Sequence, residues 1–392
     1  MADEPIESLG GITPLQAACK PNIDAIAKLG RNGLLKSVPE GFHPGSEIAI
    51  LSVLGYDIAK VFEGRGVLEA ASMGVEIEPG EMAMRCNLIT VSDGKIVNHS
   101  AGHISNEEAK ELIEYLQQKL GNQCAIFFNG VSYRHLMKIR GGDKHINTTP
   151  PHDVAGVDFK SVLAKPLTES ARQTAELINE LIIKSQELLP EHRINKRRMA
   201  EGRAPASSIW PWSPGYRPTM ETLMQKYGIV SGRVISAVDL IKGIGVYAGL
   251  PPINVVGATG LYDTNYEGKA AAAIDALKEH DFVFLHVEAS DEAGHEGDIE
   301  LKIKTIEALD GRVVGPILRA VSSWTEPVTI AVLPDHPTPC LLRTHTSDPV
   351  PFTIYNPETE ADSVDRFDEF EARKGSFGLL SGDRFMKALM QK

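Results

Sequence analysis

Residues 282–295 of the chain read FVFLHVEASDEAGH, and this stretch decides the expected fold. The apolar run Phe282–Val287 is typical of a buried strand. Asp291 and His295 follow this run, and their spacing would place both side chains on one face of a helix. Taken alone, the same spacing is typical of a helix N-terminus with an acidic residue and an incidental histidine.

A second strand-like run ends in the same kinds of residue. Val328–Leu333 is followed by Asp335 and His336, and His345 comes shortly after them. Open α/β sheets build their sites at the carboxyl ends of neighbouring strands. Carboxylate oxygens and imidazole nitrogens suit divalent ions such as Mn²⁺ and Zn²⁺. Two carboxylate–imidazole pairs and a third histidine therefore predict a site for two metal ions.

The composition is that of a globular protein without low-complexity segments. A chain of 392 residues is too long for one ordinary core and favours two domains. The net charge of -12 argues against nucleic-acid binding, which requires clustered Lys and Arg. No apolar run is long enough to span a membrane, and the N-terminal pattern is not that of a signal peptide. Because the 4 cysteines lie far apart without a CxxC pair, we expect a reduced, cytoplasmic protein.

The pattern along the chain divides into three regions. Residues 166–392 alternate helix-length stretches with short apolar runs, which predicts a mostly parallel sheet. We therefore predict an α/β fold in which residues 1–62 and 166–392 form a mostly parallel sheet flanked by helices. Residues 63–165 are expected as a smaller inserted α+β domain. The expected elements of the larger domain are helices at Asn22–Leu29 and Ser170–Leu189, a loop at Trp210–Gly215, and strands at Val234–Val238, Ile253–Val256, Phe282–Val287 and Val328–Leu333.

The middle region predicts strands and one helix. Met82–Val91 and Lys95–His99 are separated by an Asp-Gly turn, which is a strong hairpin signal. Ser105 and Glu108 have the spacing of a capping box at the start of an amphipathic helix. Further strands are expected at Ala125–Phe128 and His135–Ile139.

Ser46 is the candidate nucleophile for metal-assisted chemistry. It follows a glycine and precedes an apolar helical segment, so its hydroxyl would lie near a helix N-terminus that favours an anionic phosphate. A nearby metal ion would lower the pKa of the hydroxyl. Without the metal-ligand pattern, a Gly-Ser pair before a helix would be read simply as a helix cap.

Other familiar motifs are absent from the sequence. There is no P-loop and no GxSxG motif. Gly243–Gly249 misses the GxGxxG spacing by one residue, and we interpret its glycines as close helix packing and not as a dinucleotide site.

Six segments of the chain, in order, resemble the archaeal-type 2,3-bisphosphoglycerate-independent phosphoglycerate mutases of the alkaline-phosphatase-like superfamily. This resemblance runs nearly from end to end and implies transfer of the phosphate of 3-phosphoglycerate to Ser46 and back to the other hydroxyl of glycerate. It also implies an inserted domain whose closure excludes water. The segments are Pro44–Ala49, Leu54–Asp57, Gly257–Gly260, Asp291–His295, Pro334–His336 and Thr344–Thr346.

The resemblance also implies roles for individual residues. Two divalent ions are expected, Mn²⁺ first and Zn²⁺, Co²⁺ or Mg²⁺ as alternatives, with no need for 2,3-bisphosphoglycerate. One ion would be held by Asp291, His295 and His345, and the other by Asp335, His336 and Ser46. The residues expected to bind the small phosphorylated substrate are Arg65, Arg85, His103, Arg134, His152, Asp153 and Lys242.

The sequence departs from the family pattern at two places. In the family an apolar strand ending in Asp-Gly precedes the residues found here as Met1–Asp3, and its Asp binds a metal. We therefore expect a sheet lacking one strand and weakened binding at the Asp335/His336 metal, unless the start codon has been assigned too late. Asp3 is not expected to replace that ligand. Ile50 stands where the family usually has a polar residue.

Two further functions stay open from the sequence. A phosphatase or a phosphotransferase acting on another small hydroxy metabolite, such as homoserine, would keep the metals and Ser46. A low-activity family member is the third possibility. Nothing in the sequence pattern marks an interface between subunits.

Overall fold

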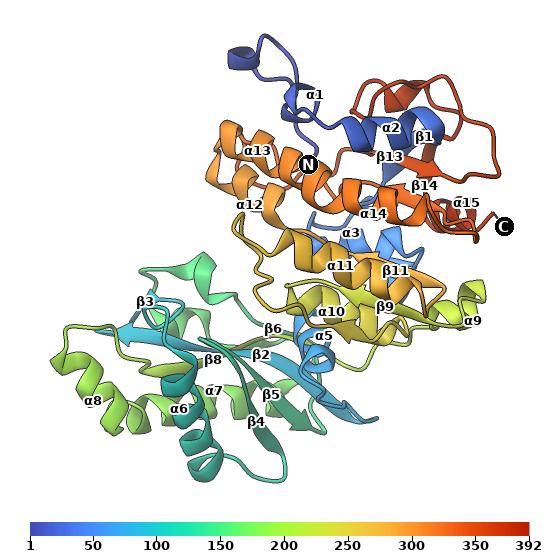
Figure 1. The fold of residues 1–392 in the computed structure, drawn as a ribbon. Coiled ribbons are helices and arrows are strands. Elements are labelled where there is room, and N and C mark those ends of the chain that lie inside the picture. The colour runs from blue at the N-terminus through green and yellow to red at the C-terminus, as the bar shows by residue number, and fades with distance from the viewer. Residues whose placement is uncertain (392) are drawn as a thin grey trace. The chain divides into compact units, whose positions relative to one another are not determined.

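The computed structural model describes residues 1–391 of the protein, which form two compact units. Unit 1 comprises Met1–Phe62 together with the chain from Thr219 onward, and unit 2 comprises Glu63–Pro218. Figure 1 shows the elements of both units. Among the described residues, no helix has the length and apolar character that a membrane crossing requires.

Unit 2 is built on an antiparallel sheet in which β2 is the central strand. Every residue of β2 from Glu81 to Thr90 is buried, because both of its faces are covered. Side chains alternate along a strand, so Arg85 and Asn87 lie on the face opposite to Met84. The strands are β2 (Glu81–Ser92), β3 (Lys95–Asn98), β4 (Ala125–Val131), β5 (Arg134–Arg140) and β8 (Ser208–Gly215).

Helices pack against this sheet and enclose the core of unit 2. The expected amphipathic helix is α6 (Asn106–Lys119), which packs against β4. The expected long helix is α7 (Arg172–Leu188), which packs against β8. The remaining elements of the unit are α5 (Arg65–Ser72), α8 (Arg193–Ala200), β6 (Ile146–Asn147), β7 (Lys165–Pro166), and the 3-10 helices η2 (Pro151–Val154) and η3 (Phe159–Val162).

The second boundary of the inserted unit differs from the expected one. The sequence placed residues 166–218 in the larger domain, whereas the structure places them in unit 2. The reason is β8, which was expected as a loop because of its prolines. It pairs antiparallel with β2 and, among residues 1–391, with no other strand, and such an edge position tolerates proline.

Unit 1 contains two sheets instead of the single mostly parallel sheet that was expected. Strands β9 (Gly232–Ile235), β10 (Pro252–Ile253) and β11 (Phe282–Leu285) form a parallel sheet in the order β10-β9-β11. The other sheet has the order β12-β13-β1-β14, and only its β1/β14 pair is parallel. Its strands are β1 (Arg31–Lys36), β12 (Ile330–Val332), β13 (Val350–Tyr355) and β14 (Gly378–Ser381).

Helices flank both sheets of unit 1. Asn22–Leu29 is confirmed as part of α2. Gly245 of α10 lies against β9, where an added Cβ would be 2.4 Å from a Val234 methyl carbon, which supports close packing as the role of this glycine. The helices are α1 (Pro14–Ala17), α2 (Pro21–Leu29), α3 (Ser46–Val53), α4 (Ile58–Val61), α9 (Leu223–Tyr227), α10 (Asp239–Tyr247), α11 (Tyr266–Leu277), α12 (Ala289–Glu296), α13 (Ile299–Leu309), α14 (Gly315–Val321) and α15 (Arg384–Leu389), with the shorter η1 (Glu7–Leu9), η4 (Asp310–Val314) and η5 (Ala372–Lys374).

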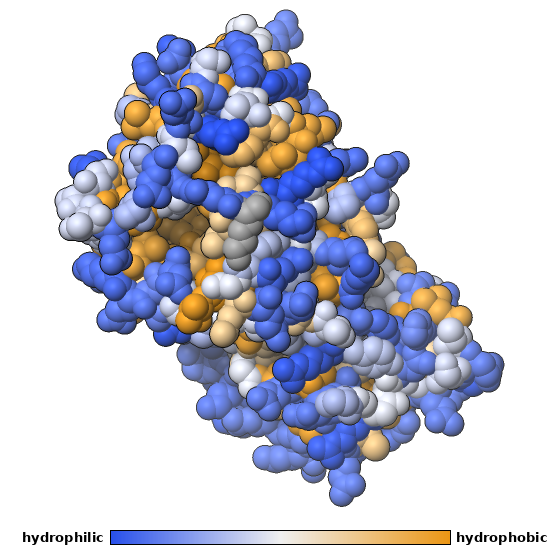
Figure 2. Space-filling view, turned by 90° about the vertical axis from the view of Figure 1, so that its right-hand side faces the viewer, coloured by the Kyte–Doolittle hydropathy of each residue, from blue (hydrophilic) through white to orange (hydrophobic). Residues whose placement is uncertain are grey.

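The surface shown in Figure 2 is largely hydrophilic, with apolar residues scattered over it. This agrees with a chain in which 23% of the residues are charged. Large apolar side chains that remain exposed include Val230, Val256 and Leu379.

Candidate functional site

The first group of candidate ligands forms where β11 leads into α12. Asp291 and His295 lie on this helix one turn apart, and Asp291 Oδ2 is 3.2 Å from His295 Nε2. His345 arrives from the segment after β12, and its Nε2 lies 2.8 Å from His295 Nε2 and 3.5 Å from Asp291 Oδ1. The three residues offer ligand atoms within 4.8 Å of one another, as a metal ion requires.

Backbone carbonyls orient the two histidines of this group. His295 Nδ1 lies 3.1 Å from the carbonyl of Arg343, and His345 Nδ1 lies 3.3 Å from the carbonyl of Pro44. A carbonyl can only accept, so in the neutral form of each ring Nδ1 carries the proton and Nε2 has a free lone pair. Two lone pairs that point at the same place fit a cation.

The second group of candidate ligands surrounds Ser46. This residue begins α3, and its Oγ lies 3.2 Å from His336 Nε2. The same nitrogen is 3.3 Å from Asp335 Oδ2. Gly45 is the residue before the helix and has no side chain that could cap it, and the Ser46 hydroxyl meets His336 instead. Its hydroxyl is therefore directed to the Asp/His group and does not serve as a helix cap.

Asp291 and Thr338 connect the two groups. The Thr338 hydroxyl donates a hydrogen bond to Asp291 Oδ1 and lies 3.4 Å from His336 Nδ1. The His336 and His345 rings are 3.9 Å apart between centroids. The predicted ligands and Ser46 therefore form one continuous cluster, although β11 and β12 belong to separate sheets.

The pKa values show how charge is distributed in this cluster. Burial raises the pKa of Asp291, but the imidazoles of His295 and His345 beside it outweigh burial and hold that pKa well below its ordinary value. The hydrogen bond with Asp291 in turn raises the pKa of His295 to about 9, so a metal ion that binds at Nε2 would displace a proton. Burial lowers the pKa of His336, which favours the neutral imidazole. A carboxylate and a neutral imidazole are the forms that bind metal, so the donor set fits divalent ions.

One histidine and one glutamate from residues 282–295, His286 and Glu288, also lie beside this cluster. His286 Nε2 is 3.2 Å from Glu288 Oε2, and His286 Nδ1 is 3.2 Å from Ser236 Oγ. Burial and the carboxylates of Asp291 and Asp335 raise the pKa of Glu288 to about 8. Sequence reasoning missed both residues, although a histidine inside an apolar strand was a signal.

The sequence analysis also singled out three other residues of unit 1, Lys242, Ile50 and Asp3. Lys242 lies on α10, which packs against α3, and its ammonium is 3.4 Å from Asp239. Ile50 is buried, one helical turn beyond Ser46. The Asp3 carboxylate is fully buried and pairs with the Lys302 ammonium at 2.8 Å, so it is already engaged in an ion pair.

The arginines expected to bind substrate gather in unit 2 around Arg85. This side chain is buried, its guanidinium lies 4.7 Å from the Trp212 ring centre, and it pairs with Glu69 at 3.2 Å. Burial lowers the pKa of Arg85, Glu69 opposes the effect, and Arg65 and Arg134 lower it further. Its Nε has no hydrogen-bond partner among residues 1–391. A buried donor among several cations is suited to an anion.

Aromatic and imidazole rings lie beside these arginines. The Tyr133 ring centre is 5.9 Å from that of His99 and 6.4 Å from that of His103. The His152 ring centre is 6.2 Å from that of His99 and 5.6 Å from that of Trp212. We refer to Arg65, Arg85, His99, His103, Tyr133, Arg134, His152 and Trp212 as the cationic cluster.

The remaining expected residues lie at the edge of this cluster. The Arg134 guanidinium is 5.9 Å from the Tyr133 ring centre. Asp153 is exposed, and its carboxylate is 3.6 Å from His152 Nε2. Sequence reasoning missed His99 and Tyr133, and it noted Trp212 only as part of a loop.

Comparisons with known proteins agree on one family. Residues 27–195 match the family model described as 2,3-bisphosphoglycerate-independent phosphoglycerate mutase. The mutase of that name from Methanosarcina acetivorans is 50% identical, over 100% of this chain and 97% of the relative. A probable mutase from Geobacter sulfurreducens is 48% identical, over 100% of this chain and 98% of the relative.

Two solved structures are similar to the chain over its whole length. A protein of Pyrococcus horikoshii has a TM-score of 0.84 at 31% identity, over 100% of this chain and 95% of that one. The cofactor-independent phosphoglycerate mutase of Thermoplasma acidophilum has a TM-score of 0.69 at 28% identity, over 100% of this chain and 96% of that one.

Proposed function

The chain belongs to the 2,3-bisphosphoglycerate-independent phosphoglycerate mutase family, and we propose from this premise how its residues perform the reaction. The protein is an isomerase that interconverts 3-phosphoglycerate and 2-phosphoglycerate. The observation that carries the proposed mechanism is the position of Ser46 Oγ, 3.2 Å from His336 Nε2 and within the cluster of predicted metal ligands.

Ser46 accepts and returns the phosphoryl group. Its Oγ loses its proton and forms a bond to phosphorus while the bond from phosphorus to the 3-oxygen of glycerate breaks, and that oxygen takes up a proton. The 2-hydroxyl then loses its proton and attacks the phosphoserine, the bond from phosphorus to Ser46 Oγ breaks, and Oγ takes up a proton. The backbone N–H groups at the start of α3 favour the negative charge of the phosphoryl group.

Two divalent ions, Mn²⁺ in first place, would be held by the residues of the cluster. Asp291, His295 and His345 would hold one ion, and Asp335, His336 and Ser46 the other. When bound, such ions stabilise the charge of the transferring group and lower the pKa of an attacking hydroxyl. The placement of the ligands after β11 and β12 also supports membership of the alkaline-phosphatase-like superfamily.

Unit 2 contributes cations that bind the anionic groups of the substrate. Arg85 suits this role because its buried Nε lacks a partner in the described part of the chain, and a guanidinium can bind a carboxylate or phosphate with two hydrogen bonds. Arg65, Arg134 and His152 add positive or polar groups beside it, with Asp153 pairing His152. Lys242 is proposed as a further contact to phosphate in unit 1.

A coupled assay of 3-phosphoglycerate conversion with added Mn²⁺ tests the mechanism. We expect conversion, with one phosphoryl group found on the Ser46 peptide by mass spectrometry. Ser46→Ala should abolish both results, whereas Ser322→Ala, at an exposed serine of the same unit, should change neither. Conversion that survives Ser46→Ala would refute the phosphoserine step. Phosphate release without isomerisation would favour a phosphatase, and transfer to homoserine would favour a phosphotransferase.

A further inference from the structure

Residues 98–104, which we call the anchored loop, have an unusual backbone. Three consecutive residues are left-handed, with φ values of 47° at Ala101, 61° at Gly102 and 51° at His103. Residues with a Cβ avoid this region, so a run of this kind persists only when its surroundings impose it. Part of the constraint is local, because Asn98 Oδ1 accepts hydrogen bonds from Ser100 N, Ser100 Oγ and Gly102 N.

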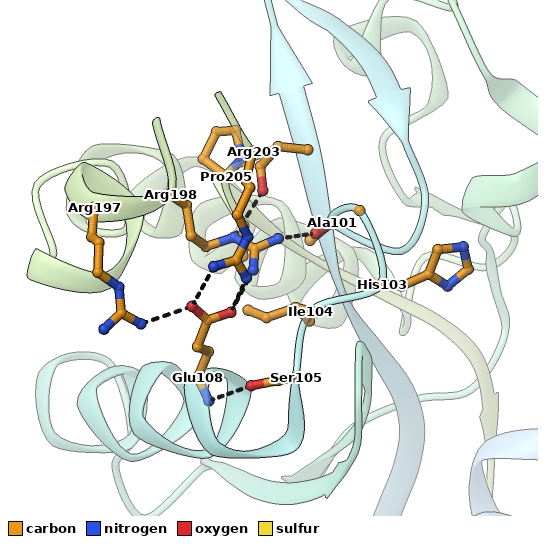
Figure 3. Close-up of polar contacts among 12 residues, drawn as sticks. Ala101, His103, Ile104, Ser105, Glu108, Arg197, Arg198, Arg203 and Pro205 are labelled. Carbon is orange, nitrogen blue, oxygen red and sulfur yellow. Dashed lines mark hydrogen bonds and ion pairs between the residues drawn. The ribbon is translucent and has the colours of Figure 1, made fainter. Parts of the chain in front are cut away.

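The other part of the constraint comes from Arg198, far along the chain on α8. This side chain is almost completely buried. Its Nη2 donates to the Ala101 carbonyl at 2.5 Å, and its Nε donates to the Ala204 carbonyl at 2.9 Å. Its Nη1 donates to Glu108 Oε2 at 2.5 Å. Figure 3 shows the contacts of Arg198 with Ala101 and Glu108. Arg198 therefore ties the anchored loop to α6 and to the segment after α8.

Glu108 holds Arg198 in place together with two further arginines. Arg197 donates to it at 2.8 Å and Arg203 at 2.7 Å. Burial raises the pKa of Glu108, but the hydrogen bonds from Arg203, Arg197 and Arg198 outweigh it and lower that pKa. The expected capping box is therefore only half formed: Ser105 Oγ accepts from Glu108 N at 3.3 Å, while the Glu108 carboxylate binds arginines.

The opposite side of the anchored loop belongs to the cationic cluster. His103 projects away from the Glu108–arginine contacts in Figure 3. His99 and His103 both lie beside the Tyr133 ring, and Asn87 Nδ2 donates to the His99 carbonyl at 3.4 Å. The loop is thus fixed from behind by a buried guanidinium while its histidines remain at least partly exposed in front.

We propose that Arg198, held by Glu108, is a positioning residue that fixes the anchored loop so that His99 and His103 can bind an anionic group of the substrate. Arg198 acts through the Ala101 carbonyl and not by touching the substrate. The inference rests on the proposed substrate-binding role of the cationic cluster. The new element is that the Glu108–Arg198 ion pair, which does not touch the substrate, supports that role.

The first test compares Arg198→Lys with Arg197→Lys in the full chain. Lysine keeps the charge but cannot make the three bonds of the Arg198 guanidinium. We expect KM for 3-phosphoglycerate to rise about tenfold with kcat changed less than about threefold, since binding and not chemistry is affected. Arg197→Lys is the matched control, because Arg197 also binds Glu108 but makes no hydrogen bond to the anchored loop within residues 1–391, and it should leave KM within about twofold. An unchanged KM in folded Arg198→Lys would overturn the proposal.

The second test is a double-mutant cycle with His103→Ala. If Arg198 acts through the loop, part of its effect passes through His103, so the rise in KM of the double variant should be smaller than the product of the two single rises, because the effects of coupled residues are not additive. Additive effects would overturn the positioning role. If His103→Ala and His99→Ala both leave KM unchanged, the proposed substrate-binding role of the cluster fails instead.

A milder variant covers the case in which Arg198→Lys does not fold. Glu108→Gln keeps an oxygen that can accept from Arg198 but removes the charge. It should raise KM by about threefold with circular dichroism unchanged. An unchanged KM in this folded variant would count against the proposal.

Discussion

The Nε2 atoms of His295 and His345 lie 2.8 Å apart, and both rings are held by backbone carbonyls at Nδ1. One carbonyl belongs to Pro44, two residues before Ser46. The residue that orients a candidate metal ligand is therefore part of the segment that carries the candidate nucleophile. This links metal binding directly to the position of the hydroxyl.

Replacement of His345 by alanine should remove a metal ligand without unfolding the protein. The affinity for Mn²⁺, measured by titration calorimetry, should fall by more than about 100-fold. That is the loss caused by mutating a residue that only hydrogen-bonds to a metal ligand. Mutase activity should fall with it. His145→Gln is the control, because this histidine is exposed and pairs with Asp143 away from the ligand cluster. Equal Mn²⁺ affinity in wild type and His345→Ala would contradict the assignment.

Replacement of Arg85 by lysine should weaken substrate binding. Lysine cannot form the two-pronged contact of a guanidinium, and it loses the stacking on Trp212. We expect KM to rise by about tenfold, which corresponds to about 1.4 kcal/mol. Arg172→Lys is the matched control, since Arg172 forms an exposed ion pair with Glu169 in the same unit. Similar KM values for the two variants would remove Arg85 from the substrate site.

His135 should make unit 2 sensitive to acid. Burial lowers the pKa of His135 to about 3, against an ordinary value of 6.5, so the unfolded chain takes up a proton first as the pH falls. Stability is complete above pH 6.5 and should decrease by about 1.4 kcal/mol per pH unit from there towards pH 3.

Tryptophan fluorescence can follow this loss in unit 2 alone. Trp210 and Trp212 lie in unit 2, and Trp324→Phe removes the only tryptophan outside it. Urea unfolding of that variant should show the pH dependence, and a further His135→Gln change should flatten it. An identical slope with and without His135 would exclude this histidine as the cause.

The buried pair of Lys302 and Asp3 should matter strongly for stability. Lys302 Nζ donates to Asp3 Oδ2 at 2.8 Å and to the Thr338 carbonyl at 2.7 Å. Lys302→Met leaves a buried carboxylate without its partner and should lower the free energy of unfolding by about 3–5 kcal/mol. Because Thr338 binds Asp291, metal affinity should fall as well.

Lys304→Met tests whether this loss is specific. Lys304 forms an exposed pair with Glu300, four residues before it, so its replacement should change stability by less than about 0.5 kcal/mol. Chemical denaturation measures both variants. Equal losses would show that the burial of Lys302 is not the cause.

Local patterns predicted much of the fold and the site. The strands β2 to β5, the helices α2, α6 and α7, and the strands that precede the ligands were read from periodicity and turn residues. The same patterns did not predict that the proline-containing β8 is a strand, nor that β1 and β13 pair as antiparallel strands. Pairing with a distant strand decides the conformation of these segments.

The sequence by itself determined which residues are candidate metal ligands, because residue type and position after a strand are local properties. Resemblance to a family gave the candidate nucleophile Ser46 its expected role and added the arginines that are expected to bind substrate. Only the tertiary structure decided which atoms meet. The carbonyls behind His295 and His345, the Glu108–Arg198 network and the position of His99 each join segments many residues apart. Such contacts depend on packing between elements, and no spacing along the chain encodes them.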